Sequence, residues 1–252
     1  WSFIDPAANL DELWGSAYDA AYAEAERDGT LVIKTMEARV IWDVLLNAQV
    51  NAGTPYVLFK DACNFKSNQK ALGTIKCSNL CAEVVEYSDA QETAVCTLGS
   101  LSLPAFVRAD GSFDFAGLMQ TTRCMVRYLN EVIDRTAYPL ESARRSNARH
   151  RPIGIGVNGL ADAFMKLRLV YGDDDALEMD RNIFAAMYYA AVEESVALAL
   201  RDGPYESFRG SPASEGLLQC DLWAGWYEAH NARKDLAGCV APLAPPTQVG
   251  AL

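Results

Sequence analysis

The amino-acid sequence predicts a mixed α/β fold, on three observations. Several segments carry apolar residues three and four positions apart, which is the spacing of helices with one buried face. Between them lie short strand-like runs bounded by proline and glycine. Of the 252 residues, 50% are hydrophobic, which is enough to bury a sizeable core in one large domain or two small ones.

The first two elements that we expect are helices. The apolar spacing of residues 10–28 predicts one helix, and Gly29 is its stop signal. Thr35 can cap a second helix, which ends at Gly53. The inward face of that second helix is predicted to consist of Ile41, Val44, Leu45 and Ala48. Both helices are interpreted as scaffold.

Strand and loop signals follow. Residues 54–59 predict a short buried strand, and the polar residues 60–69 favour a solvent-facing loop. Residues 93–107 are strand-like again, with a break at Pro104 and a turn at residues 110–111.

The remaining elements are mainly helical. Residues 113–138 predict a helix, with Cys124 beside its apolar face as a core residue. The arginine-rich residues 144–151 can attract phosphate, but a solvated loop is the commoner meaning of such a run. A buried strand then turns into a helix at Leu160–Leu167, and a long helix follows at Asp174–Asp202.

Charge and cysteine content limit the function classes. The net charge of -11 argues against a nucleic-acid or anionic-membrane binder, because both need a basic surface. No apolar run of membrane-spanning length and no signal peptide is expected, so the chain is interpreted as soluble and cytoplasmic. Seven cysteines at irregular spacing do not resemble a disulfide framework. The missing initiator methionine suggests an internal piece of a longer protein.

The chemistry concentrates in residues 79–83. In an extended segment, the side chains of Asn79, Cys81 and Glu83 point the same way. A thiol can become a reactive sulfur centre and be restored by a second thiol, for which Cys96 is the candidate. A carboxylate can accept a proton from a substrate hydroxyl, and an amide can donate and accept hydrogen bonds. Taken singly, such cysteines are more often small core residues.

Other sites are less well supported. No structural zinc site is expected, because Cys77 and Cys81 have no second cysteine pair and His150 and His230 are distant in sequence. A cysteine-protease nucleophile needs a histidine base, for which only His150 is a candidate. No serine-hydrolase elbow is present.

A dinucleotide site is a further alternative. Gly154, Gly156 and Gly159 have the spacing of a dinucleotide-binding turn, but no second strand ending in an acidic residue completes the unit. Close packing of a strand on a helix is the better interpretation of these glycines.

Five motifs carry a family resemblance. They are CNFKSNQ at residues 63–69, GTIKCSNLCAE at 73–83, AVCTLGS at 94–100, RHRPIGIGVNGLADAF at 149–164 and GPYESF at 203–208. In this order they resemble the active-site region of the class I ribonucleotide reductase large subunit, and the likeness runs from Trp1 to about Trp223. The resemblance implies part of a ten-stranded α/β barrel with a central finger loop. It assigns residues 1–223 to a partial catalytic barrel domain.

The resemblance also implies roles for individual residues. Cys81 is expected to become a thiyl radical that abstracts the 3′ hydrogen of a ribonucleoside diphosphate, and Glu83 to take the 3′-hydroxyl proton. Asn79 is expected to hydrogen-bond the ribose, and Leu80 to line the substrate site beside it. Cys96 is expected to be one member of the cysteine pair that supplies the reducing equivalents. The alternative is a non-catalytic remnant or fragment that folds or associates but cannot turn over.

Partners and cofactors are implied in the same way. The resemblance predicts a small subunit whose di-metal centre supplies the radical, thioredoxin or glutaredoxin as reductant, and a large-subunit homodimer. No cofactor or metal is expected to bind this chain directly. The second cysteine of the pair, the sites for ATP and deoxynucleotide effectors, the radical-relay tyrosines and the C-terminal cysteine tail are expected outside it.

The C-terminal residues 224–252 depart from the family pattern. The family has a Pro-Thr-Ala-Ser-Thr type loop that holds substrate phosphates, whereas residues 241–250 keep only Thr247 as a hydroxyl. No phosphate-binding role is therefore assigned to this divergent segment.

Overall fold

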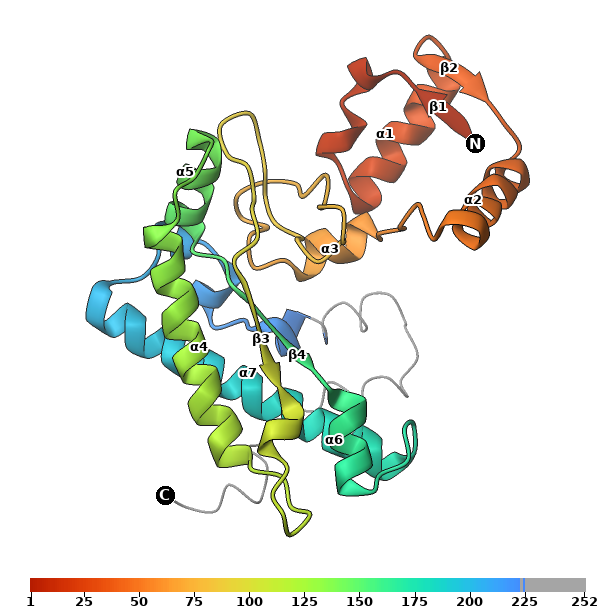
Figure 1. The fold of residues 1–252 in the computed structure, drawn as a ribbon. Helices are drawn as coiled ribbons and strands as arrows, with labels where there is room; N and C mark the ends of the chain where they lie inside the picture. Colours follow the sequence, from red (N-terminus) through yellow and green to blue (C-terminus); the bar gives the residue numbers. More distant parts are fainter. Residues whose placement is uncertain (223, 225–252) are drawn as a thin grey trace. The chain divides into compact units, whose positions relative to one another are not determined.

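The computed structural model describes residues 1–222 and 224, which form two compact units (Figure 1). The first unit contains residues 1–90 and 210–222, and the second contains residues 91–209. The predicted divergent segment 224–252 lies outside the described residues apart from Ala224, and so do His230 and Thr247.

The first unit begins with a small antiparallel sheet and a helix against it. Its elements are β1 (Ser2–Ile4), η1 (Pro6–Ala8), η2 (Leu10–Glu12), α1 (Gly15–Asp28), β2 (Val32–Thr35), α2 (Ala38–Ala52), α3 (Lys60–Lys66) and η5 (Pro212–Glu215). The hydroxyl of Tyr22 on α1 accepts a hydrogen bond from the Ser2 amide at 2.8 Å and donates one to the Ser2 carbonyl at 2.9 Å. As predicted, Gly29 ends α1, in a left-handed conformation with φ +75°. The helix starts later than expected, because residues 10–12 form the 3-10 turn η2.

Four sequence predictions for residues 35–69 of this unit are wrong in whole or in part. Thr35 does not cap α2, because it lies in β2 opposite Ser2, and Glu37 occupies the cap position. α2 has no fully buried residue: Ile41, Leu45 and Ala48 are half-buried as members of the predicted inward face, whereas Val44 is 65% exposed. Residues 54–59 form no strand, and residues 60–66 form helix α3 where a loop was predicted.

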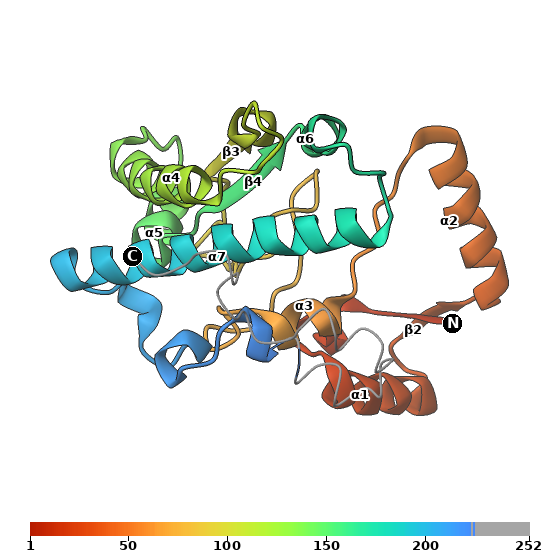
Figure 2. The same ribbon diagram turned by 90° about the horizontal axis from the view of Figure 1, so that it is seen from below.

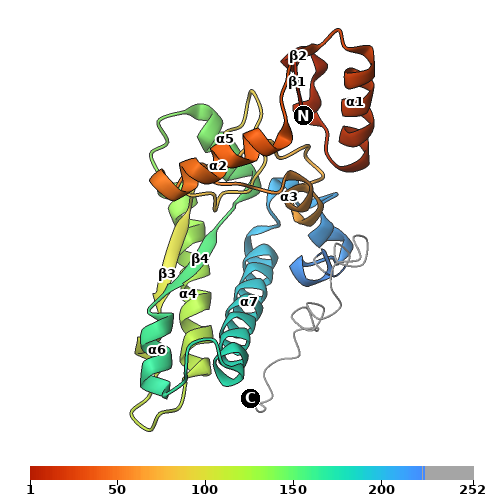
Figure 3. The ribbon, with the colours of Figure 1, turned by 90° about the vertical axis from the view of Figure 1, so that its right-hand side faces the viewer.

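The second unit contains a parallel strand pair and two long helices. Its elements are β3 (Leu98–Ser102), η3 (Leu103–Phe106), α4 (Phe115–Arg135), α5 (Glu141–His150), β4 (Gly154–Asn158), α6 (Leu160–Leu167), α7 (Asp174–Asp202) and η4 (Glu206–Phe208). β3 and β4 are parallel, with Leu98 opposite Gly154 and Ser102 opposite Asn158. Figures 2 and 3 show α4 and α7 running alongside one another. The findings therefore confirm a mixed α/β architecture with short sheets.

The core of this unit lies where α4, α7 and the strand pair meet. Leu103, Leu118 and Ile183 are fully buried there and come from η3, α4 and α7. A Cβ atom at Gly159 would lie 2.7 Å from the ring of Pro104, so the close packing predicted for this glycine is confirmed. The break predicted at Pro104 is the 3-10 turn η3.

Helix α7 meets a simple membrane criterion. It is long and apolar enough to cross a membrane by length and composition, although no such run was predicted. Its residues Ile183, Ala186 and Met187 nevertheless belong to the core cluster. In addition, Arg123 and Arg127 of α4 form ion pairs with Glu193 and Glu194 of α7 at 2.6 and 2.9 Å. These contacts make α7 a packing helix of the second unit.

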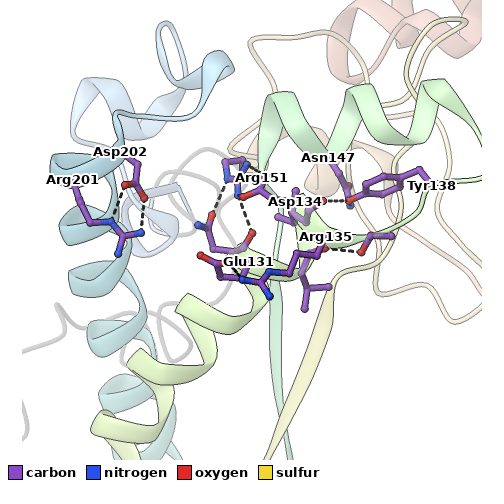
Figure 4. A network of polar contacts seen from close by, with 12 residues as sticks. Glu131, Asp134, Arg135, Tyr138, Asn147, Arg151, Arg201 and Asp202 are labelled. Carbon is purple, nitrogen blue, oxygen red and sulfur yellow. Dashed lines mark hydrogen bonds and ion pairs between the residues drawn. The ribbon is translucent and has the colours of Figure 1, made fainter.

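The structure of the arginine-rich residues 144–151 also differs from the prediction of a solvated loop. Residues 141–150 form helix α5, not a solvated loop, and Ser146, Asn147 and His150 on it are buried. Arg151 follows in a left-handed conformation with φ +49° and donates hydrogen bonds to both oxygens of the Asp134 carboxylate at 2.9 and 2.8 Å (Figure 4). The Arg151 side chain is therefore used in an ion pair within the second unit.

Candidate functional site

Two side chains from the motif at residues 63–69 hold the stems of the loop that carries Cys81. Asn64 is fully buried on α3; its amide donates to the Ile75 carbonyl at 3.0 Å, and the Ile75 amide donates to its side-chain oxygen at 2.7 Å. On the other stem, the Tyr87 amide donates to Gln69 Oε1 at 2.7 Å. The stems also lie close together, because a Cβ atom at Gly73 would be 2.6 Å from the Tyr87 ring.

The tip of the loop is a turn, not an extended segment. The Ala82 amide donates to the Asn79 carbonyl at 3.1 Å, and Ala82 is left-handed with φ +68°. The Val84 amide donates to Asn79 Oδ1 at 3.1 Å. The prediction that residues 79–83 are extended is therefore wrong, because the asparagine side chain offers the backbone a local partner that favours a turn.

The turn presents its reactive groups to solvent. Cys81 and Glu83 are exposed, Leu80 is 85% exposed, and Asn79 is half-buried. Val84, the next residue, is 7% exposed and anchors the base of the turn. The structure thus brings Asn79, Cys81 and Glu83 into one turn, with the thiol at an accessible position.

Glu86 is a titratable group beside this loop that sequence reasoning missed. Burial raises the pKa of its carboxyl from 4.5 to about 7. Its Oε2 atom is buried, with no hydrogen-bond partner among the described residues. Desolvation penalises the charged form, and no sequence pattern signals such burial.

The raised pKa of Glu86 predicts a pH-dependent stability. Between pH 4.5 and about 7 the folded chain binds more protons at Glu86 than the unfolded chain, so its contribution to stability falls as pH rises through this window. We expect Glu86→Gln to raise the melting temperature at pH 8 and to change it much less at pH 4.5. Glu26→Gln, at an exposed position of α1, is the control. An equal effect of Glu86→Gln at both pH values contradicts the prediction.

Cys96 lies in the second unit, just before β3, and its side chain is exposed. The next residue, Thr97, is buried and accepts a hydrogen bond from the Asn147 amide at 3.1 Å. Asn147 also donates to the hydroxyl of Tyr138 at 3.0 Å (Figure 4). Helix α5 therefore holds the chain beside Cys96.

The candidate residues are divided between the two units. The first unit contains Asn79, Leu80, Cys81 and Glu83, and the second contains Cys96.

A buried acid holds the segment before Cys96. Glu92 is 3% exposed, accepts a hydrogen bond from Arg149 at 2.7 Å, and lies 2.6 Å from His150 Nε2. Burial by itself raises the pKa of Glu92, but the hydrogen bonds from Arg149 and His150 outweigh it and lower the pKa. The other ring nitrogen of His150 lies 2.7 Å from Ser207 Oγ. His150 is therefore part of a structural network and is not placed as the base of a cysteine protease.

Sequence reasoning missed the supporting residues of both parts of the site. Asn64 and Gln69 were assigned to a solvent-facing loop on composition, and Asn147 to a solvated arginine-rich run. For Asn64 and Gln69 the available signal was their place in the motif at residues 63–69, whereas Asn147 lies just outside the motif at residues 149–164. Among the described residues, no three histidine, cysteine or acidic side chains gather as a metal site.

Comparison with known proteins identifies relatives over most of the chain. Residues 1–242 match the family model described as ribonucleotide reductase, barrel domain. The ribonucleoside-diphosphate reductase large subunit of Trypanosoma brucei brucei is 53% identical over 225 residues, and that of Caenorhabditis elegans 48% over 225 residues, each match covering 88% of this chain. Large chain 2 of Saccharomyces cerevisiae is 45% identical over 247 residues, 94% of this chain.

The matches cover only part of each relative. The aligned region is 27% of the Trypanosoma protein and 28% of the Caenorhabditis and Saccharomyces proteins. The chain thus spans little more than a quarter of the length of these relatives.

Proposed function

Because the chain belongs to the family of the ribonucleotide reductase barrel domain, we propose that the full-length protein containing it reduces ribonucleoside diphosphates to 2′-deoxyribonucleoside diphosphates. The observation that carries this proposal is the turn at residues 79–83, which exposes Cys81 between Asn79 and Glu83 in a chain that matches the family from residue 1 to 242.

The proposed reaction uses these residues in sequence. A thiyl radical at Cys81 removes the hydrogen atom from the ribose 3′ carbon, while Glu83 accepts the 3′-hydroxyl proton. The amide of Asn79 hydrogen-bonds the ribose, and Leu80 lines the site. The 2′ carbon–oxygen bond breaks and the oxygen leaves as water.

Cys96 completes the redox balance. Two electrons and two protons come from Cys96 and a second cysteine outside this chain, and the two sulfurs end as a disulfide. The 3′ hydrogen atom then returns from Cys81, which is again a thiyl radical, and Glu83 returns the proton to the 3′ oxygen. The exposed position of Cys96 supports this role, because thiol–disulfide exchange requires access to the sulfur.

The proposal includes the surroundings of the reaction. Residues 1–223 are part of a ten-stranded α/β barrel whose centre receives the loop with Cys81. A small subunit with a di-metal centre generates the radical, and thioredoxin or glutaredoxin reduces the disulfide. The large subunit forms a homodimer, responds to ATP and deoxynucleotides outside this chain, and works in the cytoplasm.

The isolated chain is proposed to be a non-catalytic fragment. The observation that favours this second proposal is its coverage of little more than a quarter of its relatives. Reduction requires a second cysteine and a radical source, and both are assigned to other polypeptide segments.

A direct assay tests both proposals. The full-length protein, its small subunit and a dithiol reductant are incubated with a ribonucleoside diphosphate, beside a sample in which the 252-residue chain replaces the full-length protein. We expect deoxynucleoside diphosphate from the first sample and none from the second. Absence of product from a well-folded full-length protein contradicts the proposed function, and product from the chain alone contradicts its assignment as a fragment.

A further inference from the structure

The loop that carries Cys81 is closed by a side chain that the proposed reaction does not use. Ser78 Oγ donates a hydrogen bond to the Val84 carbonyl at 2.7 Å. The Val84 amide donates to Asn79 Oδ1 at 3.1 Å. Both backbone polar groups of Val84 are therefore bound by the two residues that precede Leu80. Since Val84 is 7% exposed, the point of closure is anchored in the first unit.

The tip of the loop is exposed. Leu80 is 85% exposed and Cys81 is exposed, so side-chain packing contributes little to the direction of the thiol. Ala82 is left-handed with φ +68°, a conformation that is unfavourable for a residue with a Cβ atom. A turn of this kind persists when hydrogen bonds at its base hold it, and here these bonds come from Ser78 and Asn79.

We propose that Ser78 is a positioning residue, whose hydroxyl closes residues 78–84 into a loop and thereby fixes the direction of the Cys81 thiol. Its effect on catalysis rests on the proposed function, because the thiol must meet one particular hydrogen atom of the substrate. A catalytic group that is displaced by about 1 Å from its reacting position loses much of the rate acceleration that positioning provides. Closure of the loop itself does not depend on the reaction.

The first test measures the loop in the full-length protein. Ser78→Ala removes the hydroxyl, and Ser78→Thr keeps it. A net hydrogen bond contributes enough that its loss should speed hydrogen exchange at the Ala82 and Val84 amides by about five- to tenfold. The alkylation rate of Cys81 by iodoacetamide should change by a similar factor relative to Cys77. Ser78→Thr should stay within about twofold of the unsubstituted protein in both measurements.

A matched control is available in the same unit. Ser214 Oγ also donates to a backbone carbonyl, that of Ser211, at 2.7 Å. Ser214→Ala therefore removes a comparable hydrogen bond from η5 and should leave the exchange at Ala82 and Val84 and the reactivity of Cys81 unchanged.

The second test measures turnover. We expect Ser78→Ala to lower kcat by about tenfold or more with little change in KM, and Ser78→Thr to restore it. Unchanged exchange and alkylation in Ser78→Ala overturn the proposal. Altered exchange with unchanged kcat also overturns it, because the loop then does not need Ser78 for the reaction. If the unsubstituted protein has no activity, the proposed function fails, while exchange and alkylation still decide whether Ser78 closes the loop.

Discussion

Replacement of Cys81 by serine in the full-length protein should abolish ribonucleoside diphosphate reduction and leave nucleotide binding nearly intact. Serine is close to cysteine in shape, but its O–H bond is too strong for oxygen to replace sulfur as a reversible radical centre. Because the residue acts in the chemical step, the loss should appear in kcat and exceed about a thousandfold. Product formation is measured by chromatography, and substrate binding by equilibrium dialysis.

Cys77 provides the matched control for this substitution. It is also exposed and lies four residues before Cys81 on one stem of the same loop. Cys77→Ser should retain turnover within about twofold, because the proposed reaction gives this thiol no role. Retained turnover in Cys81→Ser contradicts the assignment of the radical residue. Equal losses in both variants indicate damage to the loop, not loss of a radical centre.

The elements predicted most accurately are those with strong local signals. The bounds of α6 and α7 agree with the sequence prediction. The start of α7 has a local signal, because Asp173 supplies a cap by accepting a hydrogen bond from the Ala176 amide at 2.9 Å. Gly29 ended α1 as expected, because a left-handed stop depends only on the residue that adopts it.

Predictions that required knowledge of distant partners were less successful. The apolar period of α2 predicted a buried face, but burial requires a second surface, and no residue of α2 is fully buried. In the arginine-rich run, Arg149 and Arg151 pair with Glu92 and Asp134, which are 57 and 17 residues away in sequence. Composition cannot reveal such partners, so helix α5 was predicted as a loop.

In the candidate site, too, local features were predicted correctly and features that depend on other residues were not. The residue types and order at Asn79, Cys81 and Glu83 were sufficient to propose the chemistry, and these residues do lie in one turn. The shape of the loop was not predictable from side-chain alternation, because the Asn79 side chain binds the Val84 amide. The support from Asn64 was not predictable either, because its partner Ile75 lies 11 residues away in sequence. The Asn64 side chain binds the amide and the carbonyl of Ile75, as a neighbouring strand would.

The network around Glu92 leads to the largest expected effect on stability. Glu92→Gln removes a negative charge whose side chain is 4% exposed from both Arg149 and His150, and Arg149 keeps only its pair with the exposed Glu206 among the described residues. Loss of one partner of a buried ion pair is costly because the other partner stays desolvated. Since the Arg149 side chain is 37% exposed, we expect a loss of about 2–3 kcal/mol in the free energy of unfolding, below the range of about 3–5 kcal/mol for fully buried pairs. Urea denaturation of the 252-residue chain measures it.

Glu206 separates the effect of burial from the effect of charge. It also pairs with Arg149, at 3.2 Å, but its side chain is 73% exposed. Glu206→Gln removes the same charge from the same arginine and should cost less than about 1 kcal/mol, because solvent screens an exposed pair. Equal losses for Glu92→Gln and Glu206→Gln contradict the prediction, since burial then does not decide the strength of the interaction.

The pH dependence of the Glu92 effect follows from the sign of its pKa shift. The pKa of Glu92 is lower in the folded chain than the ordinary value of 4.5, so the unfolded chain binds more protons at this position as pH falls. The stabilisation by Glu92 is therefore complete above the unfolded pKa and is lost as pH decreases through the folded pKa. The difference in unfolding free energy between the unsubstituted chain and Glu92→Gln should shrink as pH falls below about 4. A difference that does not shrink below this pH contradicts the assignment of Glu92 as a charged partner of Arg149.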